Sequence, residues 1–472
     1  MISAVPLPDY KPDQSVNSGV LLVAQNVYPA VDGYRPLRDV ATISDALDEA
    51  FQGGASAIST GGTGYLLAGT ATDLYKYNGG AWTGILSALT VTERWKFAQF
   101  GNYSVAVNGS DTQGVNLSAG TAAPIAAAPT GTSICVVGDY VVIGQPDGDI
   151  TAVATSAFGD HTAWTPGVDQ STLQPMLTGG EVMAVCGGEY GIILQRERIV
   201  RMTRTGDSTA PFQYDEVTSN FGCANGNTVT QSGRTIFFRS DRGFMALDDG
   251  QVLKPIGSEK VDRTFDELVS RDDYDRMYTA IDPQNKLVFW GIPGSPGTMW
   301  IYNFELDKWA TASLNFTGIF PGFTTSIGLD DLSVIYNNID TMPYTLDDPR
   351  WTGGNPRLYL VDDDRKIGTL AGDTLAARFD LGFTEFTKTR RARIRNIRPV
   401  TDATGGLSLS LDARARLGDG QNLKTASELR ASGVMPLRAS GRYISASLQI
   451  AAATDWSYIQ GLEVEYEAGG ER

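Results

Sequence analysis

A short glycine-led phrase recurs along this chain and limits the folds open to it. A glycine, or an asparagine at the last occurrence, leads into a β-branched or aromatic run in "GYLLAGT" at Gly64, "GNYSVAVNG" at Gly101, "GDYVVIGQ" at Gly138, "GEYGIILQ" at Gly188, "GRTIFFRSDRG" at Gly233 and "NKLVFWGI" at Asn285. The intervals are 37, 37, 50, 45 and 52 residues. Four-stranded propeller blades repeat every ~40 to 50 residues. The sequence predicts an all-β fold around an irregular β-propeller of six or seven blades, with a large sandwich as the rival.

A second phrase occurs twice within this region. "LYKYNGGAWTGI" spans Leu74–Ile85 and "WIYNFELDKWAT" spans Trp300–Thr311, each with a tyrosine-asparagine pair, a polar turn and a tryptophan. This order predicts a hairpin in the outer part of a blade. We expect Trp82 and Trp309 to fill the hydrophobic gap between sheets, not to serve as platforms for sugars.

Three other segments interrupt the repeats. Residues 258–278 predict a helix that caps a blade, with Val261, Phe265, Leu268 and Val269 on one stripe. Residues 165–180 indicate a long loop, and residues 328–356 a less regular final blade.

The two ends of the chain differ from its middle. Residues 1–45 predict an extended arm or the strand that closes the propeller, and residues 46–372 form the propeller. Residues 373–472 contain at least four alternating strands, which predict an antiparallel β-sandwich-like module. This last segment has 14 basic and 12 acidic residues, a net charge of +2. Because the whole chain has a net charge of −16, residues 1–372 have a net charge of −18.

Residues suited to catalysis or metal binding are scarce. His161 is the only histidine, so any Ser-His or Cys-His arrangement needs it, and its glycine-flanked position predicts a turn residue. Asp362, Asp363 and Asp364 lack the ligand alternation of a calcium loop and predict a solvated turn. The three cysteines lack metal-site spacing and predict buried free thiols: Cys135, Cys186 and Cys223. We expect no catalytic residue, cofactor or metal.

The most concentrated chemical feature is "KTRRARIRNIRP", which holds six cations: Lys388, Arg390, Arg391, Arg393, Arg395 and Arg398. On a strand, Arg391, Arg393 and Arg395 share one face. Such a ladder binds phosphates without reading sequence, or meets an acidic partner surface. In a chain of net charge −16, contacts with other protein subunits are favoured over binding of nucleic acid. An ordinary solvent-exposed face is the third interpretation.

Several stretches together resemble the tail nozzle or packaged-DNA stabilisation proteins of tailed bacteriophages. They are "NVYPAVDGYRPLRD", "LYKYNGGAW", "FGDHTAWT", "RERIVRMTRTGDSTAPFQYDEV", "NKLVFWGI" and the arginine-rich module. The resemblance implies a non-enzymatic ring subunit, commonly one of six. The ring lies beneath the portal and adaptor, next to fibres, spikes or a needle, and continues the channel for packaged DNA. It also implies a place in the virion tail after assembly in the host cytoplasm.

The alternative is a propeller that binds or cleaves glycans, because sialidase-like propellers use acids, arginines and a tyrosine. The S-x-D-x-G-x-x-W turn that such propellers repeat is missing, and only partial matches to it begin at Ser110 and Ser240. No run approaches the ~20 apolar residues of a membrane-spanning helix, so a soluble protein without a membrane span is expected.

Overall fold

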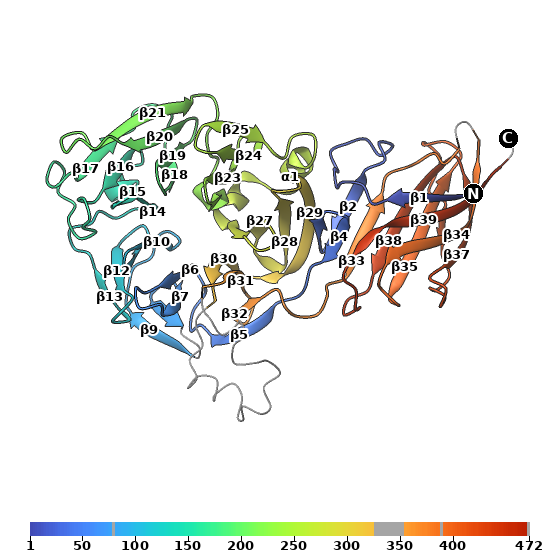
Figure 1. The fold of residues 1–472 in the computed structure, drawn as a ribbon, viewed down its shortest axis with the longest axis horizontal. Coiled ribbons are helices and arrows are strands. Elements are labelled where there is room, and N and C mark those ends of the chain that lie inside the picture. Colours follow the sequence, from blue (N-terminus) through green and yellow to red (C-terminus); the bar gives the residue numbers. More distant parts are fainter. Residues whose placement is uncertain (78–80, 325–353, 388–389, 470–472) are drawn as a thin grey trace.

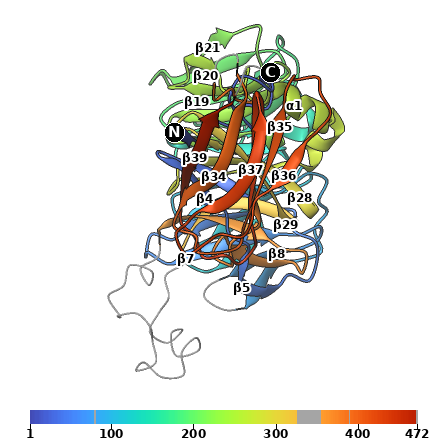
Figure 2. The same ribbon diagram turned by 90° about the vertical axis from the view of Figure 1, so that its right-hand side faces the viewer.

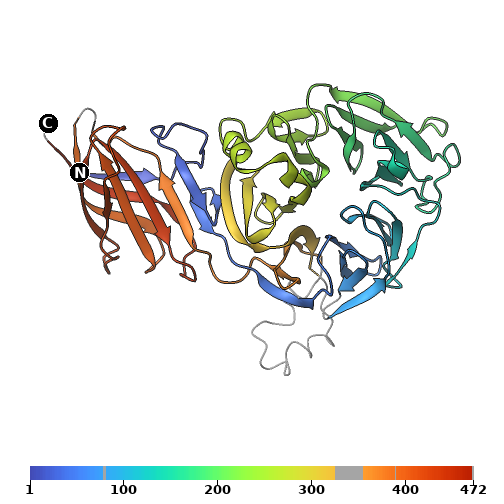
Figure 3. The same ribbon diagram turned by 180° about the vertical axis from the view of Figure 1, so that it is seen from behind.

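The computed structural model describes residues 1–77, 81–324, 354–387 and 390–469. Seven sheets surround a common axis as blades, and a β-sandwich lies to one side of them (Figure 1; seen from behind in Figure 3). The predicted all-β fold with a propeller is confirmed. The blade count within the described residues is seven.

The first four blades each have four antiparallel strands, ordered from the axis outward. They are β6 (Gly53–Ile58), β7 (Gly64–Gly69), β8 (Leu74–Tyr77) and β9 (Trp82–Leu86); β10 (Lys96–Phe100), β11 (Tyr103–Val107), β12 (Thr112–Asn116) and β13 (Thr121–Pro124); β14 (Ser133–Val137), β15 (Tyr140–Gly144), β16 (Ala152–Thr155) and β17 (Thr172–Pro175); and β18 (Val182–Cys186), β19 (Gly191–Gln195), β20 (Ile199–Arg204) and β21 (Phe212–Thr218).

The last three blades follow the same order. They are β22 (Thr230–Ser232), β23 (Thr235–Ser240), β24 (Gly243–Asp248) and β25 (Val252–Pro255); β26 (Tyr278–Asp282), β27 (Leu287–Ile292), β28 (Gly294–Asn303) and β29 (Lys308–Phe316); and β30 (Gly318–Phe323), β31 (Pro356–Val361), β32 (Lys366–Thr369) and β5 (Ala41–Ala46). Strand β5 closes the seventh blade as its outermost strand, so the two ends of the propeller sequence meet in one sheet.

The six glycine-led phrases supply the second strand of blades 1 to 6. The turn before that strand needs a left-handed residue, which glycine adopts without steric cost. Gly101, Gly138 and Gly233 have φ of 55°, 58° and 57°, and Lys286 takes the equivalent conformation in blade 6 with φ of 58°. The repeat in the sequence therefore reflects one turn geometry used in successive blades.

The two tryptophan hairpins form the outer halves of blades 1 and 6, as predicted. Each places a tyrosine opposite the tryptophan: Tyr77 and Trp82 have ring centroids 5.3 Å apart, and Tyr302 and Trp309 4.8 Å apart. Trp309 is 0% exposed, as a core residue should be. Trp82 is only half-buried, with its indole Nε1 donating to the carbonyl oxygen of Asp45.

Residues 1–45 were expected to form an extended arm or the strand that closes the propeller. Strand β5 takes the closing position, whereas the residues ahead of it form no arm but four strands within the sheets of the C-terminal module. These are β1 (Ile2–Pro6), β2 (Leu21–Gln25), β3 (Val27–Ala30) and β4 (Gly33–Pro36). Their apolar side chains, such as Leu21, Val27 and Tyr34, are buried in the module's core. Burial of these side chains is what holds the segment against the module.

The module is a sandwich of two sheets, which lies in front of the propeller in Figure 2. One sheet joins β1, β3 and β4 to β39 (Ile459–Ala468), β34 (Ala392–Thr401) and β37 (Met435–Gly441). The other contains β33 (Ala377–Leu381), β38 (Tyr443–Ile450), β35 (Leu407–Arg414) and β36 (Leu423–Thr425). Ile394, Leu409 and Leu448 are among the residues buried between them.

Strand β2 joins the module to the propeller. It pairs antiparallel with β33 and parallel with β29, so the sheet of blade 6 continues into the module as one nine-stranded sheet. Asn26, at the end of β2, donates from its backbone N to Thr311 O (2.7 Å) and from its amide Nδ2 to Ala376 O (2.8 Å). Its Oδ1 accepts from Ser313 N (2.7 Å). One hydrophobic cluster spans both parts.

The predicted helix is shorter than expected. Helix α1 covers Asp262–Leu268, and a 3₁₀ turn covers Arg271–Arg276; two further 3₁₀ turns are Pro146–Gly148 and Gly226–Thr228. Val269 has extended backbone, which ends the helix, and Ser270 starts the next turn in a capping box with Asp273. Phe265 packs on Phe244 and Trp300 of the blades, but Leu268 is 70% exposed and does not belong to the buried stripe.

The two remaining segments differ in outcome. Residues 165–180, predicted as a loop, include β17, the outer strand of blade 3. The stretch 328–356, predicted as an irregular final blade, lies outside the described residues except for its last three, of which Pro356 begins β31.

Candidate functional site

The arginine ladder lies on the solvent face of the module's six-stranded sheet. Arg393, Arg395 and Arg398 on β34 are exposed, and Arg391 is exposed just ahead of the strand. They alternate with side chains buried in the sandwich: Ala392, Ile394 and Ile397. Lys388 lies outside the described residues. Arg390 is exposed, and its carbonyl oxygen accepts from the Thr387 hydroxyl.

A row of glutamates on the neighbouring strand faces these arginines. On β39, Glu467 lies opposite Arg393, and Glu463 lies opposite Arg398. The Arg395 guanidinium pairs with Glu467 at 2.8 Å, and that of Arg398 approaches Glu463 at 3.8 Å. Opposite charges on adjacent strands stabilise a sheet modestly, by ~0.2 to 1 kcal/mol for each pair.

The mixed charges change what this surface can do. Glu465, which accepts a hydrogen bond from Asn396 at 2.6 Å, completes an acidic row beside the basic one. A phosphate would compete with these carboxylates for the guanidinium groups, whereas a protein partner could match both rows. Strand β37, the last in this sheet, adds exposed Arg438. The arrangement suits a protein contact better than a nucleic-acid backbone.

A second candidate is the central channel of the propeller, which the inner strands of all seven blades line. Its volume is about 460 Å³. Arg94 and Lys96 are its cationic residues, and no carboxylate is among the described residues that line it. The Arg94 guanidinium lies over the ring of Tyr278, 3.6 Å from the centroid, and donates to the carbonyl oxygen of Met277. A cation–π contact and a backbone acceptor therefore hold Arg94 against blade 6.

Lys96 has no such partner. Within the described part of the chain, its ammonium forms no hydrogen bond and no ion pair. Burial, together with the nearby Arg94 guanidinium, lowers the pKa of Lys96 to about 8. An unpaired cation in a partly closed channel attracts anions.

The other chemically notable residues have structural surroundings. Cys135, Cys186 and Cys223 are free and buried, and burial raises the pKa of each thiol. His161 lies in a turn, where its ring packs on Tyr103 at 4.3 Å and burial lowers its pKa.

Acidic residues likewise occupy structural positions. The stretch 362–364 forms the turn between β31 and β32, as predicted. Within the described ranges, no group of three His, Cys, Asp or Glu side chains is placed to hold a metal ion. The helices of the described residues are too short or too polar to cross a membrane.

Comparisons with known proteins give distant structural matches. No protein-family model matches it, and no curated protein matches it. Among solved structures, an extracellular domain of a hybrid two-component system from B. thetaiotaomicron aligns over 84% of this chain and 46% of its own, with 10% identity and a TM-score of 0.40. The RRP9 WD40 repeats align over 61% of this chain and 88% of their own, with 9% identity and a TM-score of 0.38. The chain spans about half the length of the first of these.

Proposed function

We propose that this protein is a structural subunit of a bacteriophage tail nozzle, which assembles as a ring, commonly of six, below the portal and adaptor and helps retain packaged DNA. Besides the sequence resemblance, one observation supports this role most: a nine-stranded sheet and a shared core make the propeller and the module one body. A ring wall that must withstand packaged DNA benefits from subunits that do not flex at an internal hinge.

The distribution of charge along the chain also supports the proposed nozzle role. Residues 1–372 carry a net charge of −18, which would repel DNA and let it slide past the propeller. The arginine and glutamate rows of the module, defined by Arg393, Arg395, Arg398, Glu463, Glu465 and Glu467, would then contact a neighbouring subunit or the adaptor.

Charge swaps in the full chain test this assembly surface. Arg395→Glu and Glu467→Arg each break the 2.8 Å ion pair, whereas the double variant restores a pair within the chain but reverses the pattern shown to a partner. We expect all three variants to fold and all three to be lost from purified particles in a complementation assay. Recovery by the double variant would show that only the internal pair matters and would contradict the proposed contact.

A matched control uses an ion pair on the propeller. Arg234 and Glu189 are exposed on neighbouring blades and pair at 2.5 Å, and Arg234 also approaches Asp249 at 3.7 Å. Arg234→Glu with Glu189→Arg is the same kind of double charge swap as at Arg395 and Glu467, but it lies outside the module. Incorporation of this control at the wild-type level is expected, and its loss would mean that any surface charge swap disturbs assembly.

A glycan-binding propeller is the second candidate, favoured by the unpaired Lys96 in a channel without a described carboxylate. Acidic sugars would meet this cation. Saturable binding of sialyllactose that Lys96→Met abolishes would support this candidate, whereas binding unaffected by the variant would remove its basis.

A further inference from the structure

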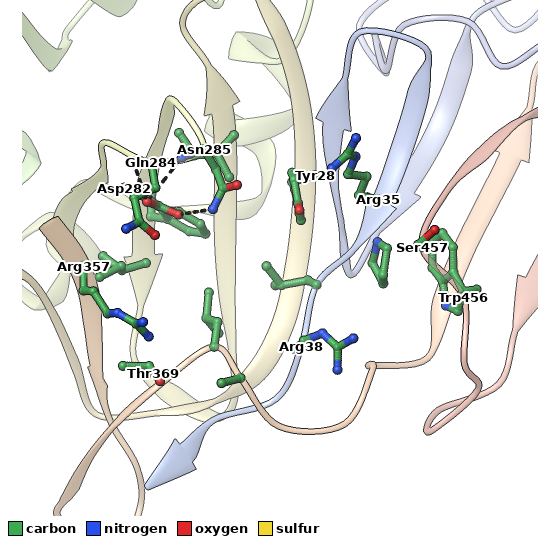
Figure 4. Close-up of a pocket in the computed structure, with 17 residues that line it drawn as sticks. Tyr28, Arg35, Arg38, Asp282, Gln284, Asn285, Arg357, Thr369, Trp456 and Ser457 are labelled. Atoms are coloured by element: carbon green, nitrogen blue, oxygen red, sulfur yellow. Dashed lines mark hydrogen bonds between the residues drawn. The ribbon is translucent and has the colours of Figure 1, made fainter. Parts of the chain in front are cut away.

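A pocket of about 360 Å³ lies where the propeller meets the module (Figure 4). Blade strands form one side through the β26–β27 turn, β31 and β32. The β3–β4 hairpin with the residues after it, and the turn ahead of β39, form the other. Sites between two structural units are frequent places for small ligands.

The pocket is strongly cationic. Arg35, Arg38 and Arg357 line it, and Figure 4 shows Arg357 and Arg38 flanking its lower part from opposite sides. None of the three forms an ion pair with a carboxylate of the described residues. This contrasts with the module's outer face, where Arg395 has its glutamate at 2.8 Å.

The carboxylate in the pocket is already used by its own turn. Asp282 Oδ1 accepts from the backbone N of Gln284 (3.0 Å), and its Oδ2 accepts from Asn285 Nδ2 (2.7 Å). These hydrogen bonds, drawn as dashed lines in Figure 4, cap the β26–β27 turn. The pocket therefore holds three arginines and one carboxylate, whose oxygens are committed to its own turn. The Arg38 guanidinium donates to the carbonyl oxygen of Gly372 (3.1 Å) and that of Arg35 to the Tyr28 hydroxyl, so their hydrogen bonds go to neutral oxygens.

Two buried donors in the pocket wall have no acceptor. The indole Nε1 of Trp456, a residue that is 2% exposed, and Nε of Arg357 have no hydrogen-bond partner. Buried donors are nearly always paired, so an unpaired one calls for an explanation. The Tyr28 hydroxyl accepts a hydrogen bond from the Arg35 guanidinium, and burial raises the pKa of Tyr28, so the hydroxyl keeps its own proton to donate. The pocket thus offers an excess of donors and positive charge.

We propose that this pocket binds a phosphate group, either free inorganic phosphate or the phosphate of a small molecule such as a mononucleotide. Guanidinium groups match phosphate oxygens in a fork geometry, and a dianion suits several cations that lack carboxylate partners. Because Arg38 and Trp456 come from the module side and Arg357 from the propeller, the bound group would connect the two parts. The inference does not depend on the proposed nozzle function.

Calorimetric titration of the full chain with inorganic phosphate and with AMP tests the proposal, at constant ionic strength adjusted with chloride. We expect saturable binding that Arg357→Met weakens by about tenfold or more, as loss of a charged hydrogen bond should. Arg38→Met, at an exposed position, gives a second test should Arg357→Met fold poorly.

Arg263→Met is the matched control, because Arg263 is exposed on α1 and has only a 3.8 Å approach to Glu267. Affinity unchanged in this variant but reduced in the pocket variants supports the proposal. Equal loss in all variants would indicate general attraction to charge, and absence of saturable binding to either probe would also overturn the site. Equal affinity for phosphate and AMP assigns free phosphate, whereas tighter AMP binding assigns a phosphorylated small molecule.

Discussion

Blades 1 and 6 carry the same tyrosine–tryptophan hairpin, but in different surroundings. In blade 1, β9 is the outermost strand, and Trp82 on it stays half-buried. In blade 6, β2 pairs with the outermost propeller strand, and the indole of Trp309 on that strand is enclosed by Phe244, Trp290 and Tyr302 of the propeller. The same local sequence thus forms a free outer edge in one blade and a joint in the other.

The difference between the two blades shows how a second unit is attached to the propeller. Blade edges expose backbone groups that can accept a further strand. Here the N-terminal strand β2 occupies such an edge and continues the sheet into the module, so the joint needs no separate linker domain. The free and joined edges should therefore differ measurably in stability.

Truncating the two tryptophans should give the largest contrast. Trp309→Ala should lower the free energy of unfolding by ~3 to 5 kcal/mol, because it leaves a cavity in a closed core. Trp82→Ala should cost about 1 to 2 kcal/mol, since part of that ring already contacts water. Urea unfolding followed by circular dichroism measures both values, and equal losses would contradict the distinction between the edges.

Breaking the joint should have the next largest effect. Asn26→Ala removes the side-chain bonds to Ser313 N and Ala376 O and places alanine at a φ of 60°. A loss of ~2 to 3 kcal/mol follows from the unpaired groups and the strained backbone. Asn26→Gly removes the same bonds without that strain, and is the control. We expect urea unfolding to separate into two transitions in Asn26→Ala; a single unshifted transition would mean that other contacts hold the joint.

The inner edges of the blades carry Lys96, which lies on β10 and lines the channel. The pKa of Lys96 is about 8 in the folded chain, below the ~10.4 of an unfolded lysine. The unfolded chain therefore binds more protons between these pH values, and the free energy of unfolding rises as pH increases through that window.

Lys96→Met should remove this dependence. At pH 7 the variant should be more stable than the wild type by about 1 to 2 kcal/mol, allowing for water in the channel. Lys424→Met, at an exposed lysine of β36, is the control. Thermal unfolding from pH 7 to 10 measures the effect. A variant that is less stable at pH 7 and keeps the pH-dependent rise would contradict the account of Lys96.

The smallest effect is expected on the module's outer face. Arg395 and Glu467 are both about half exposed, so a double-mutant cycle to alanine should give a coupling of ~0.2 to 1 kcal/mol that disappears at high salt. A larger coupling that does not change with salt would contradict this expectation, because it would mean that the pair is shielded from solvent despite its exposure.

The repeats could be predicted because they depend on local geometry. The glycine turn and the alternating strand after it lie within ten residues, so each second strand was identified, as was the position of both tryptophan hairpins. The helix was overestimated because the predicted stripe included Val269 and the helix was continued to residue 278, although Val269 has extended backbone and Ser270 begins a separate 3₁₀ turn.

Long-range pairing was beyond the sequence. Gln25 pairs with Thr311 across most of the chain, and no local pattern encodes that register. Strand β39 is one of the alternating strands that the sequence predicts in residues 373–472, but the position of its glutamates beside Arg393 and Arg398 depends on how β34 and β39 align. Arg94 and Lys96 carry no motif at all, because only closure of the propeller brings their strand to the channel.

The most direct test of the proposed nozzle role is quantitative mass spectrometry of gradient-purified phage particles from the source. If the protein forms the nozzle, this chain is present at a fixed copy number relative to the portal, at the ratio of a six-subunit ring. Absence from the particles, or a variable trace amount, would contradict the nozzle role.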